Sequence, residues 1–352
     1  MRRAVLAALL LAGLTGCAWR DVLPTSREIE DMVLVQTMGV DGGEDKCIVT
    51  ASGGGREGKP AQVVSGQAGS LSAAVLTVQG EGPSYLYFGH VAQLLLGEEL
   101  AAEGVGPALD YILRDVETRL DTALYLVRGG TAGEAIRAAA EDGSAAQRLD
   151  TMAEEAGLLA FSMPRTVKDV MADQYAQGAS FAPALLADGK LGAVGYGILK
   201  EDALVGWAEG EAALGVSLAL GQVEADVVEL GSDTVRVVHA RTKVRPIVED
   251  GTVTGLSVRC RVEANLAEGT ADLADPEQVA RLEEALAQRE QARLEAALAL
   301  AKELDADYLG LRSDAALAAP WHKDQLEGEK GLAGLDLEAE VQAKLRRSYE
   351  AD

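Results

Sequence analysis

The sequence predicts an α+β protein with more than one domain, in which each domain is a mixed or antiparallel sheet packed with helices. Three observations support this fold class. The chain has 352 residues, 48% of them hydrophobic, which is enough for two or three separate cores. Segments typical of helices and strands alternate up to about residue 185, and mostly strand-like segments follow from residue 191. One long amphipathic helix is then expected near the C-terminus.

We therefore expect an N-terminal α/β domain at residues 27–185 and a C-terminal α/β region at residues 191–347. The C-terminal region could divide into two subdomains, residues 191–270 and 271–347. The boundary is placed at residues 176–190, because this stretch contains the turn-forming sequences Gln177-Gly178 and Asp188-Gly189.

The N-terminal domain begins with residues 27–40, whose apolar β-branched stretch predicts a strand that ends in a turn at residues 41–43. Residues 47–51 could be its hairpin partner. Thr131 and Glu134 have the spacing of a capping box at the start of a helix. Helices are expected at residues 70–78, 98–103, 105–113, 131–140 and 165–175, and strands at residues 85–88 and 122–127, with an apolar run at 91–96.

The C-terminal region is predicted to be antiparallel up to its long helix. Strands are expected at residues 192–199, 204–208, 226–230, 234–238, 241–247 and 253–263. Asp275 is a good N-cap and Pro276 suits the first helical position, so a helix is predicted to begin there. Apolar residues recur at three- and four-residue steps up to residue 304, which gives a length of about 43 Å at 1.5 Å per residue. Such a helix packs along a sheet or a partner, and packing on its own β region is the favoured interpretation. A final strand is expected near residues 335–345.

The first seventeen residues have the pattern of a lipoprotein signal. Arg2 and Arg3 precede a short apolar run at residues 4–12, and Leu14-Thr15-Gly16-Cys17 fits the bacterial lipobox. We expect a signal peptide at residues 1–16, a diacylglyceryl group on Cys17 and a polar leader at residues 17–26. The protein would then be lipid-anchored to the outer face of the cytoplasmic membrane. An ordinary signal peptide that happens to end at a cysteine is the alternative.

The charge of the chain restricts its partners. The formal net charge is −24, so the surface is expected to repel nucleic acid and anionic lipid head groups. Attachment to a membrane would then depend on the acyl chains of the lipid and not on basic residues. No nucleic-acid partner is expected.

The sequence offers no arrangement of residues typical of catalysis, cofactor binding or metal binding. Cys47 and Cys260 lie far apart in strand-like runs, so two separate strand thiols are favoured over a bridge between them. His90, His239 and His322 share no motif, and neither a CxxC pair nor a glycine-rich phosphate loop occurs. We therefore predict no catalytic, cofactor-binding or metal-binding residues.

Two places remain candidates for partner docking. Arg114, Asp115, Arg119 and Asp121 flank a predicted strand entry, and they could form a buried ion-pair network, which is favoured, or a docking surface. Trp207 ends a predicted strand and could belong to the core or anchor an interface, as large aromatic side chains often do.

Several short patterns, taken in order, resemble the Ger(x)C family of spore germination lipoproteins, the C subunits of nutrient germinant receptors. The resemblance is carried by the lipobox at Cys17 and by residues 27–31, 38–41, 87–90, 96–101, 113–127, 197–200, 204–211 and 307–310. Two regions depart from the family pattern. Residues 144–180 are hard to align, and the segment after Pro320-Trp321 lacks the aromatic residues expected before the last strand.

The resemblance implies a binding and signalling subunit with several α/β domains and no assigned chemistry. Such a protein lies on the outer face of the spore inner membrane, beside integral membrane subunits of the A and B types. Two other classes of protein are weighed against it. A solute-binding lipoprotein of a membrane importer would need two alternating βαβ lobes, which the antiparallel second half disfavours. A tethered hydrolase would need a nucleophile beside a base, and the sequence shows none.

Overall fold

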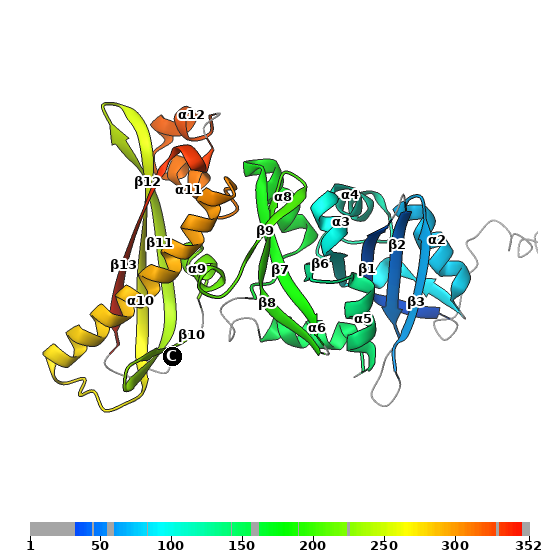
Figure 1. The fold of residues 1–352 in the computed structure, drawn as a ribbon, viewed down its shortest axis with the longest axis horizontal. Coiled ribbons are helices and arrows are strands. Elements are labelled where there is room, and N and C mark those ends of the chain that lie inside the picture. The colour runs from blue at the N-terminus through cyan, green and yellow to red at the C-terminus, as the bar shows by residue number, and fades with distance from the viewer. Residues whose placement is uncertain are drawn as a thin grey trace, which may run out of the picture.

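A computed structural model describes residues 32–346, apart from residues 44–45, 55–59, 83, 142, 156–161, 189, 224–225 and 329–330. The predicted signal peptide, Cys17 and the leader to residue 26 lie outside the described residues. The described chain forms two sheets that lie side by side along the long axis of the molecule (Figure 1).

In the described chain, nine strands form the first sheet, in the order β3-β2-β1-β5-β6-β7-β8-β9 with β4 beside β1. The central strands β1, β5, β6 and β7 are parallel, and antiparallel hairpins extend the sheet on both sides. The strands are β1 (Met32–Gly43), β2 (Lys46–Gly53), β3 (Gln62–Ala68), β4 (Tyr85–Tyr87), β5 (Gln93–Gly97), β6 (Ala123–Arg128), β7 (Ala179–Asp188), β8 (Lys190–Lys200) and β9 (Ala203–Ala208).

Helices cover both faces of the first sheet because its central strands are apolar on both sides. On β5, Leu94 and Leu96 belong to one core, and Leu95 belongs to the core on the opposite face. Helices α2, α4 and α8 pack on the first face, and α5 and α6 on the second. The helical segments are α2 (Leu71–Glu81), the 3-10 helix η3 (Phe88–His90), α3 (Glu98–Glu103), α4 (Gly106–Arg114), α5 (Ala132–Glu141), α6 (Ala145–Glu154) and α8 (Val167–Gln177).

Asp41 joins β1 to the start of α5. Its buried carboxylate accepts hydrogen bonds from the backbone N–H groups of Ala132 (2.7 Å) and Gly133 (2.9 Å). The predicted capping box is confirmed, because Thr131 and Glu134 exchange hydrogen bonds of 3.1 Å in both directions. The predicted turn at residues 41–43 is wrong, because these residues continue β1 and pair with β2.

The second sheet has four strands within the described residues, β10 (Asp226–Leu230), β11 (Asp233–Glu249), β12 (Thr252–Glu268) and β13 (Asp336–Leu345). The first three are antiparallel neighbours, and β13 runs parallel to β12. Helices α9 (Glu211–Ala219), α10 (Pro276–Glu303) and α11 (Leu311–Ala318) pack on one face of this sheet. The short segments η4 (Pro320–His322), α12 (Lys323–Leu326) and η5 (Leu332–Gly334) lie between α11 and β13.

The long helix α10 matches its prediction closely. Asp275 caps it by accepting a hydrogen bond from the N–H of Glu277 (2.9 Å), and Pro276 is its first residue. Its apolar side chains pack against β13 and α9, so the helix covers its own sheet, as favoured from the sequence.

Strands β8 and β9 follow the boundary expected at residues 176–190, and they pair within the first sheet up to Ala208. Two parts of the second half differ from the sequence analysis. The strands expected at residues 234–238 and 241–247 are one strand, β11, whose register shifts between Val237 and His239. Helix α9 was not predicted, because apolar residues occur all around it and Gly210 provides no side-chain cap.

Helix α9 connects the two sheets. It begins shortly after β9, the last strand of the first sheet, and packs closely on α10 of the second sheet. The contact depends on Gly215, because a Cβ added there would lie 2.0 Å from the carbonyl oxygen of Arg293. A backbone oxygen cannot move aside as a flexible side chain can, so only glycine fits.

We predict that Gly215→Ala lowers the free energy of unfolding by about 1 to 3 kcal/mol, because the new methyl group overpacks the contact between α9 and α10. Gly80→Ala is the matched control. Gly80 is exposed in α2 and no atom lies within 4 Å of an added Cβ, so this change is expected to be neutral or stabilising by about 0.5 to 1 kcal/mol. Urea unfolding of both variants measures the difference. Equal midpoints for the two variants would contradict the close contact.

Candidate functional site

The first predicted docking residues lie in and beside the α4–β6 loop, residues 115–122. Arg114 pairs with Asp110 at 2.7 Å, and the Nε of Arg119 donates to Asp121 at 2.9 Å. The side chains of Arg119 and Asp121 are 66% and 61% exposed. The favoured buried ion-pair network is therefore wrong, because a short loop at the surface places these charges in water. The alternative, a docking surface, stays a prediction.

The same loop and the end of α4 expose apolar side chains. Val116 and Leu120 in the loop are 98% and 37% exposed, and Leu113 in α4 is 49% exposed. The hydroxyl of Thr118 donates to the carbonyl of Ile112 at 2.8 Å, which holds the loop against α4. The loop is thus held by hydrogen bonds and presents apolar side chains beside charges.

Asp115 lies at the base of this loop and has two roles there. Its carboxylate accepts a hydrogen bond from the N–H of Glu117 (2.9 Å), which forms an Asx turn. Burial, together with the Asp115 carboxylate, raises the pKa of the Tyr111 phenol above its usual range. The phenol therefore stays protonated, and it remains a neutral hydrogen-bond donor at the foot of the loop.

Trp207, on β9, is half-buried and packs against the core of the first sheet. Its indole N–H donates to Glu98 at 3.2 Å, and the other Glu98 oxygen accepts from the N–H of Gly129 at 2.5 Å. The Arg128 guanidinium lies 5.8 Å from the Trp207 ring centroid and pairs with Glu209. Trp207 thus closes the edge of a core and has its polar atom satisfied, so its structural role is established.

The structure does not bring the two candidate places together. The α4–β6 loop leads into the first residue of β6, whereas Arg128 ends that strand. At about 3.3 Å per residue, the two ends of β6 are separated by roughly 16 Å. The loop and the Trp207 neighbourhood are therefore separate surfaces at opposite edges of the first sheet.

A buried cluster of charged residues lies between α9, α10 and β10, and it was not predicted from the sequence. Arg293 contacts three carboxylates, those of Glu290 (2.7 Å), Glu211 (3.3 Å) and Asp226. Leu286, Glu290 and Leu294 are spaced four residues apart, so the helix period could have placed Glu290 on the buried face of α10. Burial raises the pKa of Glu290 to about 7, although the Arg293 charge acts in the opposite direction.

The described part of the chain has two cysteine thiols outside these sites, and neither is activated as a nucleophile. Cys47 on β2 and Cys260 on β12 are both free thiols, so the expectation of separate strand cysteines is confirmed. Burial raises the pKa of the Cys260 thiol to about 11 and also raises that of Cys47, which makes both poor nucleophiles near neutral pH. No group of three or more His, Cys, Asp or Glu residues in this part could hold a metal ion. None of its helices combines the length and hydropathy needed to cross a bilayer.

Comparison with known proteins gives a consistent result. The model of the spore germination protein N-terminal domain matches residues 25–186, and the "Spore germination B3/ GerAC like, C-terminal" model matches residues 194–349. The "Putative spore germination protein YfkR" of Bacillus subtilis (strain 168) is 28% identical over 218 residues, which span 57% of this chain and 54% of that protein. The crystal structure of the GerBC protein is similar with a TM-score of 0.58 and 16% identity, over 88% of this chain and 96% of that one. At this identity the structural likeness supports the α+β fold alone.

The buried cluster gives a prediction about pH. Because the pKa of Glu290 in the folded state, about 7, lies above its ordinary 4.5, the contribution of this group to stability falls as pH rises through that window. In Glu290→Gln the side chain cannot titrate and still accepts from Arg293. We expect this variant to lose about 2 to 3 kcal/mol less stability than the wild type between about pH 5 and about pH 8.

Urea unfolding at the two pH values measures this difference. Glu295→Gln, which changes an exposed carboxylate on the same helix, serves as the control and should follow the wild type. If Glu290→Gln and the wild type lose the same stability over this range, Glu290 does not carry the pH dependence.

Proposed function

Because this chain belongs to the GerAC-like family of spore germination proteins, we propose that it is a lipid-anchored, non-enzymatic subunit of a spore germinant receptor. It acts in nutrient-triggered germination through contacts with integral membrane subunits of the A and B types. The observation that carries this proposal is the match of both domain models of the family, in order, over residues 25–186 and 194–349.

The lipobox supports the proposed anchor. The start of the chain has the pattern of a lipoprotein signal, with Arg2 and Arg3, an apolar run at residues 4–12 and Leu14-Thr15-Gly16-Cys17. The net charge of −24 would repel an anionic bilayer. Acyl chains on Cys17 would overcome this repulsion and hold the protein on the outer face of the spore inner membrane.

The α4–β6 loop is the proposed contact with the membrane subunits. Val116 is 98% exposed and lies between the charged residues Arg114 and Arg119, so the loop offers an apolar centre with a polar rim. Trp207 is a weaker candidate for direct contact, because its ring is half-buried and its N–H already has a partner in Glu98.

The alternative of a solute-binding importer lipoprotein gains no support from the fold. That class would have two lobes of alternating strands and helices around a cleft. In the described residues the second sheet is instead an antiparallel meander with one parallel edge strand.

Replacing the lipid site tests the anchor. We expect Cys17→Ala to remove the acyl mass from the protein, release it from the spore membrane fraction and abolish or strongly delay the nutrient-triggered loss of refractility. Cys47→Ala is the matched control, because it removes a half-buried free thiol on β2 and leaves the lipobox intact. A normal germination response from the Cys17→Ala strain would contradict the proposal.

A charge in the loop tests the docking surface. We expect Val116→Asp to reduce co-purification of the two membrane subunits from detergent-solubilised spore membranes by about tenfold or more, because it puts a charge at the apolar centre. Leu76→Asp, at a position on α2 that is 73% exposed, is the control and should behave as the wild type. Both variants should keep the wild-type thermal midpoint. Unchanged co-purification with Val116→Asp would remove the loop from the interface.

A further inference from the structure

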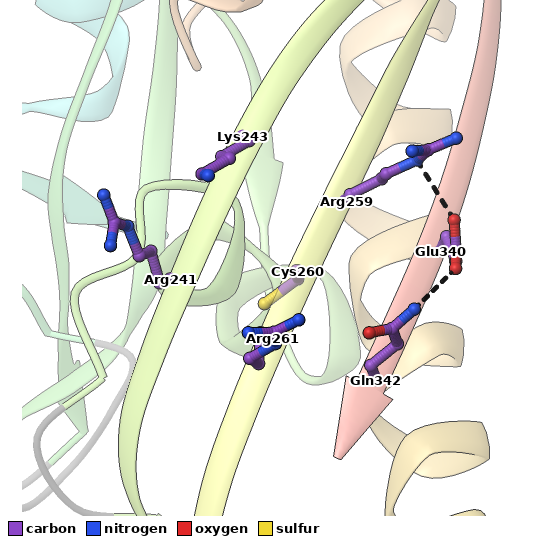
Figure 2. Close-up of a pocket in the computed structure, with 7 residues that line it drawn as sticks. All are labelled: Arg241, Lys243, Arg259, Cys260, Arg261, Glu340 and Gln342. Atoms are coloured by element: carbon purple, nitrogen blue, oxygen red, sulfur yellow. Dashed lines mark hydrogen bonds and ion pairs between the residues drawn. The ribbon is translucent and has the colours of Figure 1, made fainter. Parts of the chain in front are cut away.

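The second sheet has two unlike faces. Helices α9, α10 and α11 cover one face, where Val244, Val258 and Cys260 are buried. Among the described residues no helix covers the other face, and strand alternation turns the side chains between these positions toward solvent. In the middle of β11 and β12 four exposed positions are basic and line one hollow in Figure 2, namely Arg241, Lys243, Arg259 and Arg261. We call these four residues the basic face.

The register of the two strands sets like charges against each other. Arg241 is paired with Arg261, and Lys243 is paired with Arg259. Directly opposed side chains in an antiparallel pair have Cβ atoms about 5 Å apart, where like charges destabilise the sheet. Two such pairs side by side destabilise the sheet through charge repulsion. The fold of the sheet does not require this repulsion, since one neutral residue in each pair would remove it.

The chain compensates only part of this charge. Arg259 pairs with Glu340 of β13 at 3.1 Å, and the amide of Gln342 donates to the same carboxylate at 2.9 Å (Figure 2). Within the described residues, Arg241, Lys243 and Arg261 make no ion pair. The hollow that these side chains line has a volume of about 260 Å³. It is thus a basic groove that already accommodates one carboxylate at its rim.

We propose that the basic face is a docking surface for an acidic segment of a partner polypeptide, whose carboxylates bind between β11 and β12. The proposal rests on the proposed function only in that such a subunit acts through partners, and it adds the chemistry of one partner. The proposal is supported by the difference between the positive charge of this face and the negative net charge of the chain. Four cations lie together on one exposed face of a chain whose net charge is −24.

An acidic polypeptide fits this surface better than an anionic membrane does. A bilayer is an extended plane of negative charge, so it would meet the field of the whole acidic chain as well as Glu340 at the edge of the groove. A short segment can place its carboxylates against the basic face alone. The Arg259–Glu340 pair shows that the groove accepts the carboxylate group itself.

The test is a binding experiment with a fluorescein-labelled peptide of ten glutamates and the full chain in detergent. We expect a rise in anisotropy that weakens as NaCl increases. The double variant Arg241→Glu and Arg261→Glu should weaken binding by about tenfold or more. The double variant Lys168→Glu and Arg281→Glu makes the same change in net charge at exposed positions on α8 and α10, and it should weaken binding by about twofold or less.

A stability measurement separates lost binding from lost folding. Arg241→Glu alone replaces a like-charge pair with an opposite-charge pair across the strands, so it should raise the thermal midpoint by about 1 to 4 °C while weakening peptide binding. Weakened binding together with an unchanged or higher midpoint supports docking at the basic face. Weakened binding with a lowered midpoint attributes the loss to folding and contradicts the proposal.

Three further outcomes would overturn the proposal. The first is that the peptide binds the wild type no better than it binds the Arg241→Glu and Arg261→Glu variant. The second is that the basic face favours phosphatidylglycerol over phosphatidylcholine vesicles in flotation and does not bind the peptide, which assigns the surface to lipid. The third is salt-sensitive self-association in sedimentation that this variant abolishes, which assigns the surface to a second copy of the chain. None of these results depends on a germination response, so the proposed function can stand or fall separately.

Discussion

The contact between α9 and α10 is the constraint on which the arrangement of the molecule depends. Gly215 lets the backbone of α9 approach the Arg293 carbonyl, and the Arg293 side chain gathers the carboxylates of Glu211, Glu290 and Asp226 beside it. Helix α9 follows directly from the first sheet, and α10 packs on the second. The two sheets are therefore connected through a close-packed contact with a buried ionic cluster. This contact restricts their relative motion more than a flexible linker would.

The exposed surfaces fit a protein that works by contact. The ordered α4–β6 loop presents Val116 to solvent, and the basic face of β11 and β12 lies on the other sheet. The buried groups with raised pKa values, such as Asp41 and Glu290, lie where secondary-structure elements pack together. Asp41 caps α5 and Glu290 binds Arg293, so both carboxyl groups stabilise the fold. The polar groups of greatest interest for function are those left free at the surface.

Net charge proved a poor guide to local surface chemistry. A total of −24 correctly indicates an acidic chain, but it hides the cations that strand alternation collects on one face of the second sheet. The pattern Arg241-Thr242-Lys243 is visible in the sequence, and so is Arg259-Cys260-Arg261. What the sequence lacks is the register that places Arg241 opposite Arg261, because pairing between strands depends on contacts that are remote along the chain.

The sequence by itself determined the family, the α+β class and most elements with strong local signals. The long helix beginning at Pro276 and the capping box at Thr131 are examples, because period and capping depend on residues only a few positions apart. Only the tertiary structure decided that β8 and β9 complete the first sheet, that Asp41 caps α5 and that the Arg119–Asp121 pair is exposed. Each of these depends on which distant segments meet, and hydrophobic packing of whole faces decides that, since no local pattern encodes it.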